Sequence, residues 1–232
     1  MRRNKVDNSS PLKFRYSVFL SVSMLKISHL SKSFQNQPIL KDITFSIEKG
    51  GTTGISGKNG AGKTTLLRII ACIVSSDGGD ILLDDKPLLK KNNHELRRKL
   101  LYLGHSPNMY PGLSGEENLK FVMSLFGASD SVMDIDTALS TVGLKQHKWK
   151  LIRNYSRGML QRLVLAKALV TPWELLLLDE PMAGLDESGV VLLQQFIEKW
   201  QQEEKTLLMV SHQKLWLEKY CHQILHLENG II

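Results

Sequence analysis

The sequence predicts an α/β fold in which a mixed sheet core carries an inserted, mostly helical subdomain. From Met24 onward, short apolar runs alternate with segments of helical periodicity, which is typical of βαβ units and parallel strands. Residues 175–178 are all leucine, as expected for a strand buried on both faces. Residues from about 85 to 165 instead combine helical patterns with scattered charge. We therefore predict one domain over residues 24–232, with a helical subdomain at about residues 85–165.

The first part of this domain shows a strand, a turn, a second strand and a helix. Ile43, Phe45 and Ile47 alternate with polar residues, which predicts a half-exposed strand. Two glycines follow as a turn into a strand at residues 52–56, and a glycine-rich loop comes next. Helical spacing of apolar residues predicts a helix after the loop, ending near residues 75–79. Its apolar positions are Leu66, Ile69, Ile70 and Ile73.

The last third of the chain repeats this alternation of helix and strand. Ser156 stands where a helix N-cap is expected, and Leu163 and Val164 belong to the apolar face of the helix that follows. Helical spacing of apolar residues predicts another helix that includes Leu193 and Trp200. Residues 207–210 form an apolar run that predicts another buried strand. Residues 223–228 alternate like an edge strand. We interpret the tryptophans as packing anchors: Trp149, Trp173, Trp200 and Trp216.

Charge and apolar length argue against two classes of protein. The formal net charge is +7, but residues 1–23 hold five basic side chains against Asp7 alone, which leaves +3 for the rest. That value is ordinary for a protein surface, so we expect no nucleic-acid partner. The charge-free stretch at residues 16–25 is shorter than the roughly 18 to 20 apolar residues of a membrane-spanning helix. We therefore expect no span of the bilayer.

Residues 1–23 form an N-terminal extension that we expect to be disordered or to act in targeting. A basic stretch followed by residues 16–22 loosely resembles a signal or transit peptide. A mitochondrial or plastid address and a disordered tail remain the alternatives.

Cysteine and histidine spacing gives no metal site. Cys72 and Cys221 have no paired spacing, and we expect them to be small core residues in a reducing compartment. His222 and His226 lie beside Cys221, but the strand-like alternation around them is unsuited to shared ligation.

Residues 57–64 match the phosphate-loop pattern GxxxxGK[ST] between a predicted strand and a predicted helix. Glycines allow backbone N–H groups to turn toward phosphate oxygens, and the helix N-terminus favours negative charge. Lys63 is predicted to reach the terminal phosphates, and the Thr64 hydroxyl is predicted to bind Mg²⁺. The predicted nucleotide-binding residues are Gly57, Lys58, Asn59, Gly60, Ala61, Gly62, Lys63, Thr64 and Thr65.

Asp179 and Glu180 follow the leucine strand, at the end where open α/β sheets bind ligands. We predict that Asp179 holds Mg²⁺ through water. Glu180 is placed to orient or deprotonate the water that attacks the γ-phosphate. Together with the phosphate loop, the pair predicts hydrolysis of a nucleotide. A protein that consumes a nucleotide such as ATP needs a compartment that supplies it, so export of the protein is implausible.

Other motifs resemble those of the ABC ATPases. Residues 155–159 (YSRGM) resemble the LSGGQ signature, residues 183–186 (AGLD) resemble the D-loop, and His212 resembles the switch histidine. Phe34 is similar to the aromatic residue that stacks on adenine. The resemblance extends from about Met24 to residue 232, and the order of the motifs makes it specific.

This resemblance implies an ATPase that is the motor of an ABC transporter. Two copies would form a head-to-tail dimer, with each ATP between the phosphate loop of one subunit and the signature of the other. The signature residues would be Ser156, Arg157, Gly158 and Met159, and Asp186 would contact the region of the partner's His212. The resemblance also implies integral membrane subunits as partners and a place on the cytoplasmic face of the inner membrane. A mitochondrial or plastid inner membrane applies if residues 1–23 are a targeting segment.

Two departures from the family pattern point to a narrower resemblance. Arg157 and Met159 replace the usual glycine and glutamine of the signature, and His105 stands where most members have the Q-loop glutamine, a ligand of Mg²⁺. The Gly104-His105 pair, the following residues 110–119 and the form of the signature resemble the haem exporter ATP-binding subunits of cytochrome c maturation.

Three classes of function remain to be separated. A transporter motor, whether for haem or for a lipid, drug or peptide, predicts a groove near residues 100–125 that accepts a short helix of a membrane protein. A non-transport ABC protein usually has tandem cassettes or a long coiled coil, and one cassette in 232 residues disfavours it. An unrelated P-loop NTPase would leave Ser156, Asp186 and His212 as coincidence.

Overall fold

The computed structural model describes residues 22–90, 93–104, 108–127 and 133–232. His105 and nearly all of the N-terminal extension, residues 1–21, lie outside the described residues. Among the residues that are described, no helix has the length and apolar character needed to cross a membrane.

Five parallel strands form the sheet that carries the functional residues. Their order is β6 (Leu100–Leu103), β7 (Leu175–Asp179), β8 (Thr206–Val210), β3 (Thr52–Ser56) and β9 (Gln223–His226). Every residue of β3, β7 and β8 is buried, and β7 and β8 are continuous rather than alternating apolar runs. The predicted buried strands and the edge strand β9 are confirmed.

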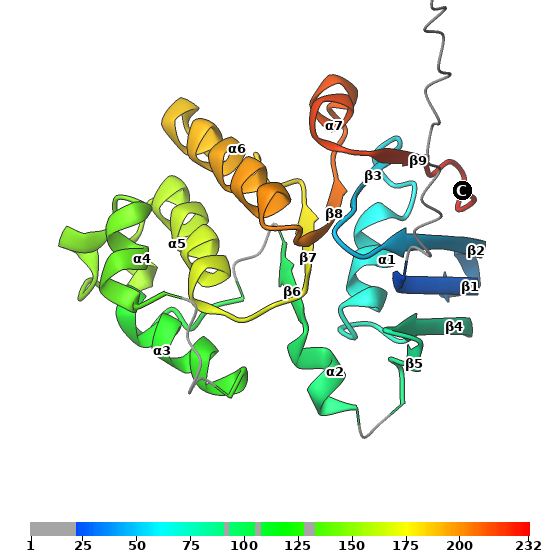
Figure 1. Ribbon diagram of the computed structural model, residues 1–232, viewed down its shortest axis with the longest axis horizontal. Helices are drawn as coiled ribbons and strands as arrows, with labels where there is room; N and C mark the ends of the chain where they lie inside the picture. Colours follow the sequence, from blue (N-terminus) through cyan, green and yellow to red (C-terminus); the bar gives the residue numbers. More distant parts are fainter. Residues whose placement is uncertain (1–21, 91–92, 105–107, 128–132) are drawn as a thin grey trace, which may run out of the picture.

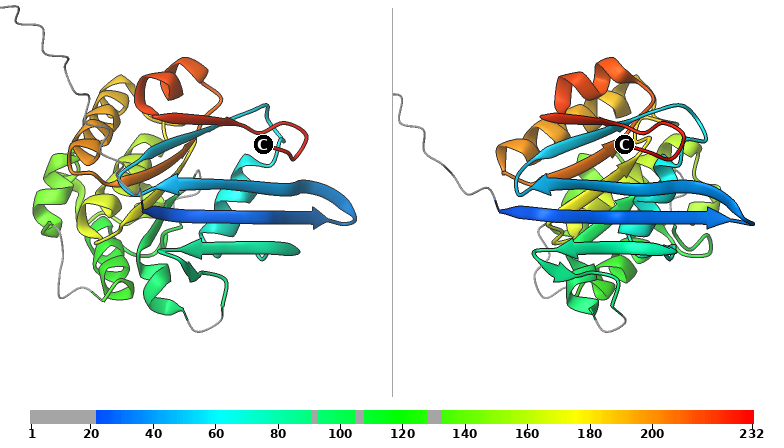
Figure 2. Two further views of the ribbon diagram at one scale, coloured as in Figure 1. Left: turned by 45° about the vertical axis from the view of Figure 1, so that its right-hand side comes forward. Right: turned by 90° about the vertical axis from the view of Figure 1, so that its right-hand side faces the viewer.

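A second, antiparallel sheet packs nearby. Its strands are β1 (Ser23–Phe34), β2 (Gln37–Glu48), β4 (Gly78–Leu83) and β5 (Lys86–Pro87), in the order β2-β1-β4-β5. Figure 2 shows the long β1 and β2 running side by side, with β4 next to β1. Ile43, Phe45 and Ile47 are buried and alternate with exposed neighbours, as the sequence predicts.

Helix α1 (Lys63–Ile70) lies between the two sheets, and the remaining helices cover other faces (Figure 1). One apolar core joins α1 with the antiparallel sheet and one face of the parallel sheet. A second core lies on the opposite face of β7 and β8. It contains residues of α3 (Gly115–Leu125), α4 (Ile135–Thr141), α5 (Arg157–Val170), α6 (Glu187–Gln202) and α7 (Lys214–Tyr220).

The range expected to form a helical subdomain, about residues 85–165, contains helices and also the strands β5 and β6. Helices α2 (His94–Arg98), α3 and α4 lie in it, with short 3₁₀ turns at Lys145–His147 and Ile152–Asn154. Strand β6 falls within the same range but belongs to the parallel sheet. The subdomain boundaries therefore stay a prediction.

Two details of the sequence prediction are wrong. Helix α1 ends at Ile70 rather than near residue 75, because Cys72 adopts a left-handed conformation with φ of 57° that a helix cannot continue. Ile73 consequently lies outside the helix and is exposed. Trp149 is 66% exposed and packs under the Lys148 ammonium rather than in a core. The other three tryptophans are buried, as predicted.

A buried asparagine fixes the chain that precedes α3. The side chain of Asn118 accepts from the Tyr110 backbone N–H at 2.8 Å and donates to the carbonyls of Tyr110 and Ser114. Ser114 caps α3 in a reciprocal capping box with Glu117. Leu113 in turn accepts a backbone hydrogen bond from Ile152. The turn before α3 is thereby tied to the segment that leads into α5.

Replacing Asn118 with alanine should lower the free energy of unfolding by about 2 kcal/mol, because it removes the hydrogen bonds of a buried side chain and leaves the Tyr110 backbone N–H without its acceptor. Urea unfolding of the variant, compared with exposed Asn154→Ala, measures the loss. Equal stability of the two variants would show that water replaces the Asn118 hydrogen bonds without cost.

Candidate functional site

The glycine-rich loop between β3 and α1 is folded around a buried lysine. Lys63 is 6% exposed, and its Nζ donates to the carbonyl oxygens of Gly57 at 2.7 Å and Lys58 at 3.0 Å. Gly60 and Gly62 have φ values of 82° and 105°, which glycine adopts readily. This geometry places a positive charge and the N-terminus of α1 within one small loop, which suits phosphate.

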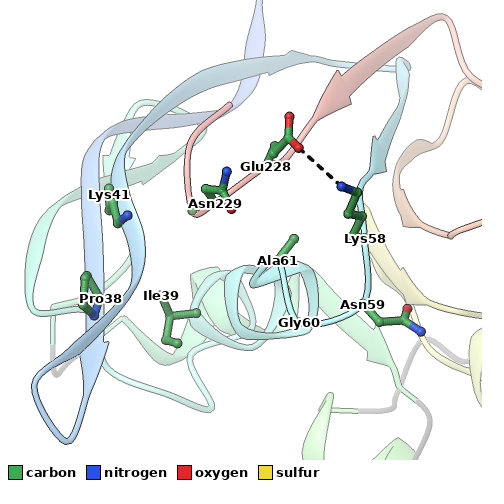
Figure 3. A pocket seen from close by; sticks show the side chains of 10 residues that line it. Pro38, Ile39, Lys41, Lys58, Asn59, Gly60, Ala61, Glu228 and Asn229 are labelled. Atoms are coloured by element: carbon green, nitrogen blue, oxygen red, sulfur yellow. Dashed lines mark ion pairs between the residues drawn. The ribbon is translucent and has the colours of Figure 1, made fainter.

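The C-terminal segment supports the same loop from behind. The Leu227 backbone N–H donates to the Ser56 carbonyl at 2.8 Å, and a Cβ at Gly57 would overlap the Leu227 carbonyl oxygen. Lys58 faces Glu228 across a hollow of about 450 Å³, which is lined also by Lys41 of β2 (Figure 3). Gly57 is therefore required by packing against the C-terminal segment as well as by any ligand.

Asp179, at the end of β7, is buried and accepts hydrogen bonds from two hydroxyl groups. Thr64 Oγ1 donates to its Oδ1 at 3.0 Å, and Tyr102 Oη donates to its Oδ2 at 2.9 Å. Burial first, and then the charge of Asp179, raises the pKa of Tyr102 to about 12, so the phenol stays protonated. The structure thus joins Thr64 and Asp179, the two residues predicted to share a cation.

Glu180 and His212 form the next pair along the same sheet edge. The Glu180 backbone N–H donates to the carbonyl of Val210, which is the last residue of β8. Glu180 has a φ of 49°, a conformation that is uncommon for residues other than glycine and concentrates at functional sites. His212 Nδ1 lies 2.9 Å from Glu180 Oε2. The two residues predicted to be catalytic are therefore in direct contact.

One hollow of about 300 Å³ brings part of the predicted phosphate loop together with Glu180. Lys63, Thr64 and Glu180 line it, as does Phe34, which is 46% exposed. Ile39, Asn59, Gly60, Gly62 and Thr65 complete the lining. The hydroxyl of Thr64 and the carboxylate of Asp179 are hard oxygen donors of the kind that Mg²⁺ prefers. The residues present therefore fit ATP and Mg²⁺.

The signature-like residues lie at the N-terminus of α5, outside that hollow. Ser156 is the N-cap, and its hydroxyl accepts from the Met159 backbone N–H at 3.2 Å. Arg157 lies over Gly184, whose φ is 85°, and a Cβ at Gly184 would lie 2.7 Å from Arg157 Nε. The unusual arginine of the signature thus packs on the D-loop of its own chain.

A second arginine holds the far end of the D-loop. Arg162 Nη2 donates to Asp186 Oδ1 at 2.9 Å and to Ser188 Oγ at 2.7 Å. The backbone N–H of Gly189, followed by Arg162, lowers the pKa of Asp186 below its ordinary value. Asp186 also caps α6, so the D-loop is fixed to both α5 and α6.

Sequence reasoning missed three residues of this site: Tyr102, Arg162 and Leu227. Each meets its partner from a distant part of the chain, so no local pattern identifies it. The only sequence indication for Tyr102 is a polar group within an otherwise apolar run, residues 100–103.

Comparison with known proteins establishes the family. Residues 40–183 match the ABC transporter family. The chain belongs to this family. SrtF, a lantibiotic transport ATP-binding protein of Streptococcus pyogenes, is 35% identical over 82% of this chain and 80% of its own length. CcmA, a cytochrome c biogenesis ATP-binding export protein of Xanthomonas campestris, is also 35% identical, over 82% of this chain and 86% of its own length.

Solved structures agree with the family at the level of the fold. The ATP-binding subunit of an ABC transporter superposes with a TM-score of 0.82 at 25% identity, covering 90% of this chain and 88% of that one. The cassette MJ0796, in a dimeric state bound to ADP and phosphate, gives a TM-score of 0.79 at 24% identity, covering 90% and 96%. This ABC protein is an ATP-binding subunit that hydrolyses ATP, and its P-loop NTPase fold is the one predicted.

Replacing Gly57 with alanine should unfold part of the ABC domain's phosphate loop, because the new Cβ overlaps Leu227. We expect a loss of about 2 kcal/mol or more in stability and a weaker affinity for ATP. Thermal unfolding and nucleotide titration measure the two effects. Gly112→Ala is the control, since no atom lies within 4 Å of a Cβ there and its φ is not positive. A Gly57 variant as stable as the Gly112 variant would contradict the role of the C-terminal segment.

Proposed function

We propose that ATP is bound and hydrolysed in the hollow that contains Lys63, Thr64 and Glu180. The observation that supports this assignment is the convergence there of a buried cation, a helix N-terminus and Glu180, whose carboxylate is contacted by His212. Backbone N–H groups of residues 59–65 hold the phosphates, and Lys63 turns from the loop carbonyls to phosphate oxygens. Phe34 stacks on the base.

Thr64 and Asp179 hold the metal ion, with His105 as a further candidate ligand in the place of the Q-loop glutamine. Bound Mg²⁺ supplies charge neutralisation on the phosphate oxygens. His105 lies outside the described residues, so its role rests on the sequence alone.

Glu180 is the base in the proposed mechanism, and His212 orients it. The Glu180 carboxylate accepts the proton of the water that attacks the γ-phosphate. His212 holds one carboxylate oxygen at 2.9 Å, which leaves the other oxygen for that water.

The signature residues complete the site of a second copy in this proposal. Ser156, Arg157, Gly158 and Met159 lie at a helix N-terminus that the same chain's phosphate loop does not use. The arginine contacts to Gly184 and Asp186 hold the signature and the D-loop together as one surface for the partner. The dimer of MJ0796 bound to ADP and phosphate supports a nucleotide-bound homodimer here.

Glu180→Gln should reduce ATP hydrolysis by about 10²- to 10⁴-fold while keeping ATP affinity, because it removes the base and preserves the shape. ATP should then accumulate in a dimer, which size-exclusion chromatography with light scattering detects. The same variant carrying Ser156→Arg should stay monomeric with ATP, since the added side chain occupies the signature surface. A Glu180→Gln protein that remains monomeric with ATP would count against the dimer mechanism.

An exposed apolar surface on α3 offers a contact for the membrane subunit. Tyr110, Phe121 and Leu125 are 53%, 38% and 56% exposed, and the rings of Tyr110 and Phe121 meet edge to face at 4.8 Å. Phe121 and Leu125 are four residues apart and share a helix face. We propose that this α3 surface receives a short helix of an integral membrane subunit, which holds the ATPase against the membrane. The ATPase would be held on the cytoplasmic face of the cell membrane, or at the inner membrane of a mitochondrion or plastid if residues 1–23 direct it there.

We propose that the transporter carries haem, or serves a haem-handling step of cytochrome c biogenesis. The support is the Gly104-His105 pair together with the similarity to CcmA. SrtF is equally similar, so a peptide exporter of the lantibiotic kind is the second candidate. Both candidates share the ATPase mechanism and differ in the membrane subunits that they recruit.

Purification of the tagged protein from detergent-solubilised membranes of its host separates the two substrates. Small haem-handling subunits identified by mass spectrometry, together with haem in the complex, would support the first candidate. Recovery of a different permease would reject the haem assignment and leave the proposed role as a transporter ATPase unchanged.

Phe121→Asp in the same purification tests the α3 surface. We expect the recovery of membrane subunits to fall at least about tenfold, because a charge is placed in an apolar contact. Ile73→Asp, an equally apolar and 54% exposed position on another surface, should leave recovery unchanged. Equal recovery with both variants would overturn docking on α3.

A further inference from the structure

Tyr102 and Asp179 contact each other from neighbouring parallel strands. The phenol donates to Oδ2 of Asp179 at 2.9 Å, while Thr64 holds Oδ1 at 3.0 Å from the start of α1. Asp179 is 3% exposed, so water has little access to either oxygen. Both carboxylate oxygens are therefore fixed by hydroxyl donors from different elements.

The direction of Tyr102 follows from the alternation of β6. Leu101 and Leu103 belong to the core on the α5 side, whereas Tyr102 packs with the core on the α1 side. Because successive side chains of a strand point to opposite faces, Tyr102 reaches the same side of the sheet as α1. Thr64 lies at the N-terminus of that helix.

Gly104 leaves the space that the phenol occupies. A Cβ at Gly104 would lie 2.5 Å from Cζ of Tyr102 and 2.6 Å from Cε1, distances that are too short for real contacts. Gly104 is itself buried, and its φ is not in the left-handed region that would require glycine. The glycine is therefore required by the neighbouring ring rather than by the backbone.

We propose that Tyr102 is a positioning residue that orients Asp179 toward the metal ion of ATP, and that Gly104 is retained to admit its phenol. The proposal rests on the proposed function, in which Asp179 helps to hold the metal. A carboxylate that is hydrogen-bonded at only one oxygen can turn about its Cβ–Cγ bond. The phenol removes this freedom and satisfies the buried Oδ2. Tyr102 thus acts through Asp179 and touches neither ATP nor the metal.

Titration with a fluorescent non-hydrolysable ATP analogue, in excess Mg²⁺ and again in EDTA, tests this role without measuring hydrolysis. The Mg²⁺ gain is the dissociation constant measured in EDTA divided by the one measured in Mg²⁺. Tyr102→Phe should lower the gain from Mg²⁺ by about tenfold, as expected for loss of a hydrogen bond to a charged group, and leave binding in EDTA unchanged. Tyr220→Phe, which removes a phenol bonded by Lys219 far along the chain, should change neither.

Gly104→Ala gives a second, independent measurement. It should reproduce the loss seen with Tyr102→Phe by displacing the ring, and the double variant should show no further loss in the Mg²⁺ gain. Thermal unfolding of each variant identifies any protein that fails to fold. If Gly104→Ala fails to fold, the Tyr102→Phe titration alone still decides the proposal.

Three outcomes would overturn the proposal. An unchanged or larger Mg²⁺ gain in Tyr102→Phe would show that Asp179 is held without the phenol. Equal weakening in Mg²⁺ and in EDTA would show a structural role only. A normal Mg²⁺ gain in Asp179→Asn would overturn the proposed metal role of Asp179 as well. If Asp179→Asn loses the gain while Tyr102→Phe keeps it, only the role of Tyr102 is rejected.

Discussion

The carboxylate of Asp179 is the point at which three elements of the structure meet. It ends β7, accepts from the first turn of α1 and accepts from β6 across the sheet. A buried carboxylate is costly unless its oxygens are paired, and the hydrogen bonds from Thr64 and Tyr102 offset that cost. The same contacts set the distance between the phosphate loop and the end of β7, where Glu180 follows.

Parallel pairing explains why the remaining functional residues gather around Asp179. The strands β6, β7, β8 and β3 run in one direction, so the segments after their last residues leave at one edge of the sheet. Gly104, Glu180, His212 and the phosphate loop are those segments. Each position is thus decided by strand order and register, and a shift of one residue would turn the side chain of Asp179 away from α1.

Similarity of this chain to relatives with different transport roles has a structural explanation. In the proposed function, the hollow that contains Lys63 and Glu180 binds the nucleotide, and its lining does not distinguish one cargo from another. Cargo selection would then depend on the membrane subunits that we propose the chain recruits. Identity of 35% to both SrtF and CcmA is consistent with a shared ATP-binding subunit in transporters of different cargo.

The sequence by itself determined the nucleotide chemistry and the family. Glycine spacing in residues 57–64, the carboxylates after the leucine strand and the capping position of Ser156 are local patterns, and they need only adjacent residues to be recognised. The tertiary structure decided which distant groups complete them. Tyr102 meets Asp179 across 77 residues and Leu227 meets Ser56 from the far end of the chain, because sheet pairing brings these segments together. Exposure of Trp149 and the early end of α1 were decided in the same way, since burial and backbone conformation depend on neighbours that local periodicity does not contain.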